Sequence, residues 1–211
     1  HDKYLQLSVG LNAYSGDIGG FGTGKGLLDQ WNLASPRPLV SLGYKYALSN
    51  RWAIKGLASA VLLAGNSDNV DVKYRPFLHR WFNTTMFEIG ANVEYAFLKG
   101  SEGINQLYIL AGAGVSLGTA VKLYSEDDTL LKAGEEGDLN PPVAPFGSIG
   151  LGWQHDFQRW AMGVELFGQY HLSDFLDGVR FVKTDVNDML LGINFIFSYN
   201  FKKSKTCNCD W

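Results

Sequence analysis

The chain has 211 residues and a formal net charge of −3, and 18% of its residues are charged, against a usual quarter. No run approaches 18 consecutive apolar residues, so the sequence excludes a helical membrane protein. The negative charge and the lack of a basic stripe argue against nucleic-acid binding. The length suits one all-β domain, and if the protein is exported we expect its signal peptide to have been removed.

Seven segments alternate between apolar and small or polar residues, which is the period of a β-strand. In chain order they cover residues 4–13, 38–48, 51–63, 85–98, 106–117, 146–154 and 160–171. We expect long loops at residues 14–37, 64–82 and 118–145, and a fourth longer loop after residue 171. Short turns separate the other segments, so long and short connections alternate along the chain.

The last alternating segment, Asn187 to Phe201, is the clearest. Every second residue from Met189 to Phe201 is apolar or aromatic, and the residues between them are mostly small or polar. A tilted strand of about 9–11 residues is what a bilayer-spanning barrel needs. The sequence predicts an eight-stranded antiparallel up-and-down transmembrane β-barrel over residues 1–201, with short periplasmic turns and long extracellular loops. Both termini are then periplasmic, and residues 202–211 form a periplasmic C-terminal tail.

The charged strand residues indicate which face of each strand is inside. All five fall on the face of small residues, where they can pair in the lumen, whereas a cation facing lipid would cost about 2–4 kcal/mol. We interpret them as a structural ion-pair plug, because eight strands leave no open aqueous pore. A soluble lipocalin-like barrel, apolar inside, is the alternative. The five residues are Lys45, Lys55, Glu88, Glu94 and Glu165.

Aromatic residues gather near the short turns and the end of the last strand. Such a girdle is typical of the periplasmic rim of an outer-membrane barrel. It consists of Tyr44, Tyr46, Trp52, Tyr95, Phe97, Trp153, Trp160, Tyr199 and Phe201.

His171 and Ser173 raise an enzymatic alternative. A histidine base beside a serine nucleophile is the logic of acyl hydrolysis, and an H-x-S stretch with carboxylates downstream resembles outer-membrane lipid A deacylases. The asparagine and the preceding arginine of that family are absent here. A small-barrel adhesin that binds through loop 14–37 is a further alternative.

Four stretches resemble the PorG-like outer-membrane barrels of the type IX secretion apparatus of Bacteroidota. They are YSGDIGG (14–20), RPLVSLGYKYALSNRWAIKG (37–56), LAGNSD (63–68) and HLSDFLDGV (171–179). The last accounts for His171 and Ser173 without catalysis, although His171 and Gly178 depart from the family pattern.

This resemblance implies a non-enzymatic role. PorG-like proteins are integral outer-membrane components that anchor a periplasmic ring, built by a lipoprotein and its partner (PorK and PorN). The resemblance brings no catalytic residue, cofactor or metal. We expect the short turns and the tail to make the partner contacts. Cys207 and Cys209 are too close for an easy disulfide and too few for a zinc site. The tail candidates are Lys202, Lys203, Lys205, Cys207, Cys209 and Trp211.

Overall fold

The structure, a computed structural model, describes residues 2–15, 36–66, 81–100, 105–119, 122–124, 143–157, 159–172 and 188–201. These residues form nine strands: β1 (Lys3–Ser15), β2 (Arg37–Ala47), β3 (Trp52–Asn66), β4 (Trp81–Lys99), β5 (Asn105–Gly118), β6 (Lys122–Tyr124), β7 (Val143–Phe157), β8 (Trp160–His171) and β9 (Met189–Asn200). Within this part of the chain, no helix is long and apolar enough to cross a membrane.

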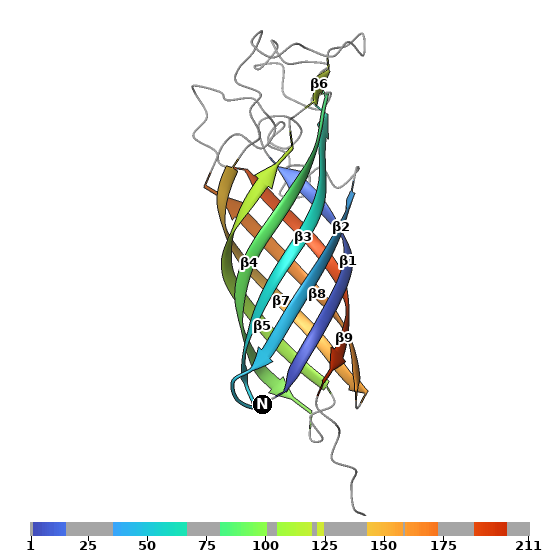
Figure 1. The fold of residues 1–211 in the computed structure, drawn as a ribbon, viewed down its shortest axis with the longest axis vertical. Helices are drawn as coiled ribbons and strands as arrows, with labels where there is room; N and C mark the ends of the chain where they lie inside the picture. The colour runs from blue at the N-terminus through green and yellow to red at the C-terminus, as the bar shows by residue number, and fades with distance from the viewer. Residues whose placement is uncertain are drawn as a thin grey trace, which may run out of the picture.

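Eight of the strands close into one antiparallel barrel (Figure 1). The neighbours run β3-β2-β1-β9-β8-β7-β5-β4, and β4 pairs again with β3 to complete the circle. Each of these eight strands therefore pairs with the barrel strands that precede and follow it along the chain, and β1 pairs with β9. The predicted eight-stranded up-and-down barrel is confirmed.

The two ends of the barrel differ. At one end β1 begins and β9 finishes, with Tyr4 opposite Asn200. The strand ends that flank the short connections at residues 48–51, 100–104 and 158–159 lie at the same end, which we name the turn end. The opposite end, where the long connections begin and finish, is named the loop end. The N-terminus marks the turn end at the bottom of Figure 1.

The exterior of the barrel is apolar and its interior is polar. Large apolar side chains are exposed on each of the eight barrel strands. Phe195 is 50% exposed and Val93 45% exposed, whereas Glu94 is 2% exposed. A soluble barrel would show the reverse, so the lipocalin-like alternative is wrong. This inverted arrangement is the one that a bilayer requires of a barrel.

Several element boundaries differ from those predicted. β6 lies inside the predicted loop 118–145 and pairs with Trp81–Asn83 of β4. β3 ends at Asn66 and β4 begins at Trp81, so both strands extend into the predicted loop 64–82. β7 runs from Val143 to Phe157 and is longer than the predicted segment 146–154. Alternation records which side chains face apolar surroundings, whereas backbone pairing can continue beyond that zone. The pattern therefore ends before the strands do.

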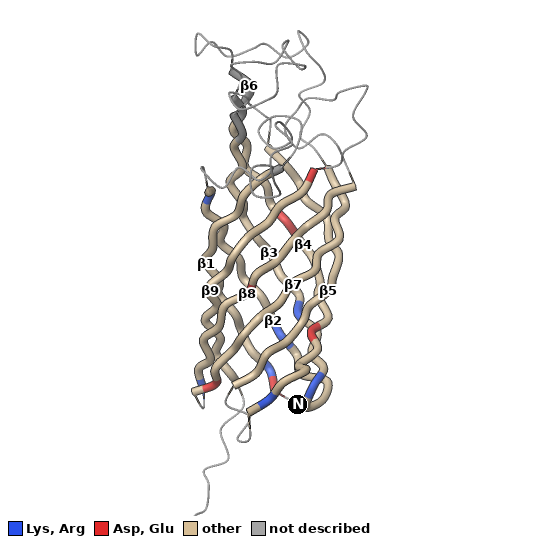
Figure 2. The backbone as a smooth tube through the Cα atoms, turned by 180° about the vertical axis from the view of Figure 1, so that it is seen from behind, with Lys and Arg blue, Asp and Glu red and all other residues tan. Residues whose placement is uncertain are grey.

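Aromatic rings meet at the turn end as the girdle prediction requires. The ring centroids of Trp52 and Tyr95 lie 4.6 Å apart, and those of Trp160 and Tyr199 lie 4.9 Å apart. Figure 2 shows that charged residues are sparse along the barrel wall and more frequent toward the turn end. The turn end is thus bordered by an aromatic and charged rim.

Candidate functional site

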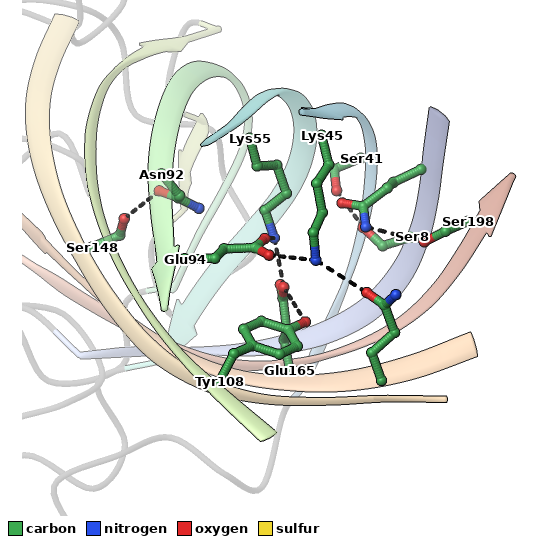
Figure 3. A network of polar contacts seen from close by, with 12 residues as sticks. Ser8, Ser41, Lys45, Lys55, Asn92, Glu94, Tyr108, Ser148, Glu165 and Ser198 are labelled. Atoms are coloured by element: carbon green, nitrogen blue, oxygen red, sulfur yellow. Dashed lines mark hydrogen bonds and ion pairs between the residues drawn. The ribbon is translucent and has the colours of Figure 1, made fainter. Parts of the chain in front are cut away.

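The lumen near the turn end contains a chain of alternating charges. Lys45 of β2 and Lys55 of β3 are opposite each other in the register, and both are buried. Glu94 of β4 joins them: Lys45 Nζ lies 2.6 Å from its Oε2, and Lys55 Nζ lies 3.1 Å from its Oε1. Lys55 also crosses the lumen to Glu165 of β8, with 2.5 Å between Nζ and Oε1 (Figure 3). Two lysines and two glutamates thus neutralise each other.

Two uncharged side chains complete this network. Tyr108 of β5 donates its hydroxyl hydrogen to Glu165 Oε1 at 2.7 Å. Lys45 donates to Gln154 Oε1 of β7 at 3.2 Å. The Tyr108 ring fits because its register partner is Gly152, where a Cβ atom would overlap the ring. The lumen network, defined as Lys45, Lys55, Glu94, Tyr108, Gln154 and Glu165, therefore links six of the eight barrel strands.

Because this network is buried, its ion pairs are important for the stability of the barrel. Each of its four charged residues is at most 5% exposed. Removing one partner of a buried ion pair leaves an uncompensated charge and costs about 3–5 kcal/mol. The chemistry of the network is accordingly structural: it connects opposite walls and blocks the lumen. The predicted ion-pair plug is confirmed for Lys45, Lys55, Glu94 and Glu165.

The middle of the lumen is filled by hydroxyl and amide groups. Ser148 donates to Asn92 Oδ1 at 3.0 Å, and Gln6 donates to Ser198 Oγ at 3.0 Å. The hydroxyls of Ser8 and Ser41 are also in contact (Figure 3). A cavity of about 50 Å³ remains here. It has room for a few water molecules, each of which needs about 10–15 Å³.

The two mouths of the lumen have different chemistry. At the turn end, a cavity of about 160 Å³ is lined by charged residues that include Asp2, Lys99 and Asp156, and its lining also includes Lys45 and Glu94. Toward the loop end, large apolar side chains join the buried polar ones, which there include Asn12, Thr84 and Asp188. The apolar ones are Tyr14, Leu39, Val61, Leu63, Met86 and Leu190. The lumen is therefore open to polar contacts at the turn end, and its loop end is packed by apolar side chains together with buried polar groups.

His171 lies in a second cluster inside the barrel. Its side chain is fully buried, with Nε2 3.1 Å from Ser116 Oγ and 3.8 Å from Glu88 Oε1. Glu88 also accepts hydrogen bonds from Ser116 Oγ at 3.3 Å and from Gln169 Nε2 at 3.2 Å. The sequence pointed to Ser173 as the partner of His171, but Ser173 lies outside the described residues. We name Glu88, Ser116, Gln169 and His171 the outer cluster.

Sequence reasoning placed Glu88 in the lumen but did not find its neighbours Ser116 and Gln169. It also gave no role to Tyr108 or Gln154. Tyr108 had one available signal, since a large aromatic residue on a face of small residues needs a glycine opposite it. Gln154 had none, because its contact with Lys45 joins strands that are not neighbours.

The candidate partner-binding residues of the tail lie outside the described residues, which end at Phe201. They are Lys202, Lys203, Lys205, Cys207, Cys209 and Trp211. Most of loop 14–37 lies outside as well. Within the described ranges, no three His, Cys, Asp or Glu side chains group in a way that could hold a metal ion.

No protein-family model matches the sequence, and no curated protein matches it. Solved structures do match its fold. Neisserial surface protein A (NspA) aligns with 94% of this chain and 97% of its own, at 10% identity and a TM-score of 0.56. Ail, the attachment invasion locus protein of Yersinia pestis, aligns with 95% of this chain and 98% of its own, at 13% identity and a TM-score of 0.50. The chain is thus a closed, eight-stranded β-barrel with the fold of outer-membrane barrel proteins.

Proposed function

We propose that this chain is an integral outer-membrane component of a type IX secretion apparatus, where it anchors a periplasmic protein ring. The filled lumen is the observation that carries the proposal. Lys55 and Glu165 join opposite walls through a 2.5 Å ion pair, and the neighbouring cavity is about 50 Å³. Such a barrel offers no route for a protein substrate, so we assign its function to its surfaces.

The exterior supports a location in the bacterial outer membrane. Its apolar side chains would face lipid, and the aromatic pairs at the turn end would lie at the membrane interface. Short turns of outer-membrane barrels face the periplasm. In this proposal the turn end, both termini and residues 202–211 are therefore periplasmic.

The resemblance to PorG-like barrels supports the choice of partner. Its longest stretch, residues 37–56, covers β2, the 48–51 turn and the first residues of β3, and it supplies both lysines of the lumen network. The residues of that turn are exposed at the turn end. We propose that this turn and the tail contact a ring lipoprotein and its partner, of the PorK and PorN kind, and that the protein is not an enzyme. The burial of His171 inside the barrel supports the last point.

Co-purification tests this function. The affinity-tagged full chain, extracted in mild detergent from its native cell envelope, is expected to recover two periplasmic ring proteins. A variant that lacks residues 202–211 is expected to recover much less of both. The measurement is the ratio of each ring protein to the barrel, by quantitative mass spectrometry.

A matched control removes residues 20–30 from the connection between β1 and β2, two strands whose ends at this connection lie at the loop end. This variant is expected to recover the ring proteins as well as the full chain does. Recovery of no periplasmic protein by the full chain would contradict the anchoring function. Equal recovery by the tail-deleted variant would remove the tail from the contact and leave the turns.

A further inference from the structure

The exposed charges of the barrel are all positive, among the residues whose burial the structure describes. Four of the five lie at the turn end: Lys3, Arg51, Lys99 and Arg159. The acidic residues described beside them, Asp2 and Asp156, are half-buried and line the lumen mouth. The outer rim of the turn end is therefore positively charged.

The sequence concentrates positive charge in the same segments. The two termini and the three short connections, residues 1–3, 48–51, 99–104, 156–159 and 202–211, hold seven Lys or Arg and four Asp or Glu. The whole chain holds 18 Lys or Arg and 21 Asp or Glu. These segments are therefore basic in a chain that is acidic overall, and a concentrated positive charge of this kind attracts an anionic partner.

Two of the exposed cations flank the end of β9. Phe201 N donates to the carbonyl of Lys3 in β1 at 3.0 Å, and Asn200 N donates to the carbonyl of Arg159, just before β8, at 2.8 Å. Neighbouring strands lie about 4.8 Å apart, so the Cα atoms of Lys3 and Arg159 are about 10 Å apart. Within the described residues, neither side chain forms an ion pair. Two long cationic side chains can therefore reach one anion between them.

Aromatic rings and an apolar wall adjoin this pair of cations. Trp160, 60% exposed, contacts Tyr199 with 4.9 Å between the ring centroids, and Tyr199 contacts Phe201 with 5.5 Å between theirs. Exposed apolar side chains continue from here along the outer wall toward the loop end. They are Leu5 and Leu7 of β1, Met162 and Leu166 of β8, and Phe195 and Phe197 of β9. Two positive charges thus lie at the edge of an apolar surface, with aromatic rings beside them.

This order of groups matches a phospholipid better than it matches a protein. Aromatic rings are enriched at the interface of a bilayer, and lysine and arginine side chains reach from its apolar region to the headgroups. Arginine also binds phosphate oxygens through two parallel hydrogen bonds. An acidic protein that approaches from water would use the two charges but not the apolar wall that continues away from them.

We propose that the turn-end rim of β8, β9 and β1 binds one anionic phospholipid, with its phosphate between Lys3 and Arg159. Its acyl chains lie along the apolar wall of the same three strands. The lumen mouth is a separate feature, because Arg51 and Lys99 line it, whereas Lys3 and Arg159 do not. The lipid site is also independent of the anchoring of a ring, since it needs only a bilayer around the barrel.

Native mass spectrometry of the full chain in detergent micelles measures the affinity for single lipids. One phosphatidylglycerol, which is anionic, is expected to bind at least about fivefold more tightly than phosphatidylcholine, which is zwitterionic, when both have the same acyl chains. Fivefold corresponds to about 1 kcal/mol, the contribution of one basic residue near an anionic surface. The double variant Lys3→Gln with Arg159→Gln is expected to lose this preference. It should still fold, because the hydrogen bonds of Lys3 and Arg159 to β9 use backbone carbonyls.

The matched control is the double variant Arg51→Gln with Lys99→Gln. It removes the same amount of positive charge from the turn end, but from residues that line the lumen mouth. It is expected to prefer phosphatidylglycerol as the wild type does. An equal loss of preference in both double variants would overturn the proposal, because the preference would then come from the total charge of the turn end.

Two further outcomes would also overturn a lipid as the occupant. A wild type that binds both lipids equally would leave the two cations to an acidic protein surface. Glycerol phosphate has the phosphate without the acyl chains, so it is expected not to displace phosphatidylglycerol at the same concentration. Displacement at that concentration would mean that the site binds phosphate alone.

Discussion

The two halves of the lumen are stabilised in different ways. In the turn-end half, four charges and two hydrogen-bonding side chains form one connected network. In the loop-end half, the Glu88 carboxylate accepts hydrogen bonds from neutral donors, Asp188 accepts one from the Tyr14 hydroxyl, and large apolar side chains fill much of the remaining lumen. Along its axis the same barrel thus changes from ion pairing to apolar packing with neutral hydrogen-bond donors.

One strand displays the whole change. The buried inward residues of β3 are Ala53, Lys55, Ser59, Val61 and Leu63 in order toward the loop end. All have the same parity, so alternation assigns them to the same face. Whether a residue number is odd or even thus decides whether its side chain faces the lumen or the exterior. The position of the residue along the barrel axis decides whether a lumen side chain is charged, polar or apolar. A buried ion pair needs its exact partner, whereas apolar packing tolerates exchange, so the two halves should respond differently to substitution.

Glu94→Gln is expected to have the largest effect. Glu94 is shared by Lys45 and Lys55, and an amide leaves Lys45 without an anion in a buried site. We expect a loss of about 3–5 kcal/mol in the free energy of unfolding. Denaturant titration of the barrel in phospholipid vesicles measures it.

The matched substitution in the other half is Glu88→Gln. Its two donors are neutral and bond different carboxylate oxygens, so the amide oxygen keeps one of these hydrogen bonds and only one neutral donor loses its acceptor. We therefore expect a cost below about 1.5 kcal/mol. Equal costs at Glu94 and Glu88 would show that buried charges stabilise the two halves of the lumen in the same way.

Much of this arrangement could be predicted from the sequence. Alternation placed Lys45, Lys55, Glu88, Glu94 and Glu165 inside the barrel, and the structure confirms all five. What it could not give is which charge pairs with which. Lys55 meets Glu165 from 110 residues away because the tilt and stagger of the strands bring them to one height. No local pattern encodes that stagger.

The boundaries of β6 and β7 could not be predicted from the sequence for a different reason. β6 has three residues, too few for alternation to be recognised. Pro145 ended a predicted loop, yet it pairs with Val115 inside β7 and accepts a hydrogen bond from Leu172 N through its carbonyl. A proline lacks the backbone N–H donor but keeps its carbonyl acceptor. It can therefore lie within a strand such as β7, although in the sequence it indicates a loop.

Leu63→Ala tests the apolar half and is expected to have the second-largest effect. Leu63 is fully buried, and truncating such a side chain typically costs about 2–5 kcal/mol, depending on how far its neighbours can close the cavity. A conservative exchange separates this packing from the pairing at the turn end: Leu63→Met is expected to cost less than about 1.5 kcal/mol. If Leu63→Met were as harmful as Leu63→Ala, the loop-end half would depend on shape as strictly as the network depends on charge. Denaturant titrations of both variants, in the same vesicles, provide the comparison.

Single hydroxyl groups occur in both halves and give a further comparison between them. Tyr108 donates to Glu165 at 2.7 Å, whereas Ser116 donates to Glu88 at 3.3 Å. A short hydrogen bond to a charged group contributes about 1.5–3 kcal/mol, so we expect Tyr108→Phe to cost that much. The longer Ser116 contact should be weaker, and we expect Ser116→Ala to cost about 0.5–1.5 kcal/mol.

Tyr44→Phe is the control for the tyrosine substitution, since Tyr44 is exposed on the outer face of β2 and its loss of a hydroxyl should leave the lumen unchanged. The free energy of unfolding of the three variants gives the order directly. Glu165 already has Lys55 as a partner, so a cost for Tyr108→Phe above that of Ser116→Ala means that the hydroxyl orients the carboxylate toward the lysine. A larger cost for Ser116→Ala than for Tyr108→Phe would mean that Glu88 depends more strongly on its hydroxyl donor than Glu165 does. The reason would be that, within the described residues, no lysine or arginine pairs with the Glu88 carboxylate.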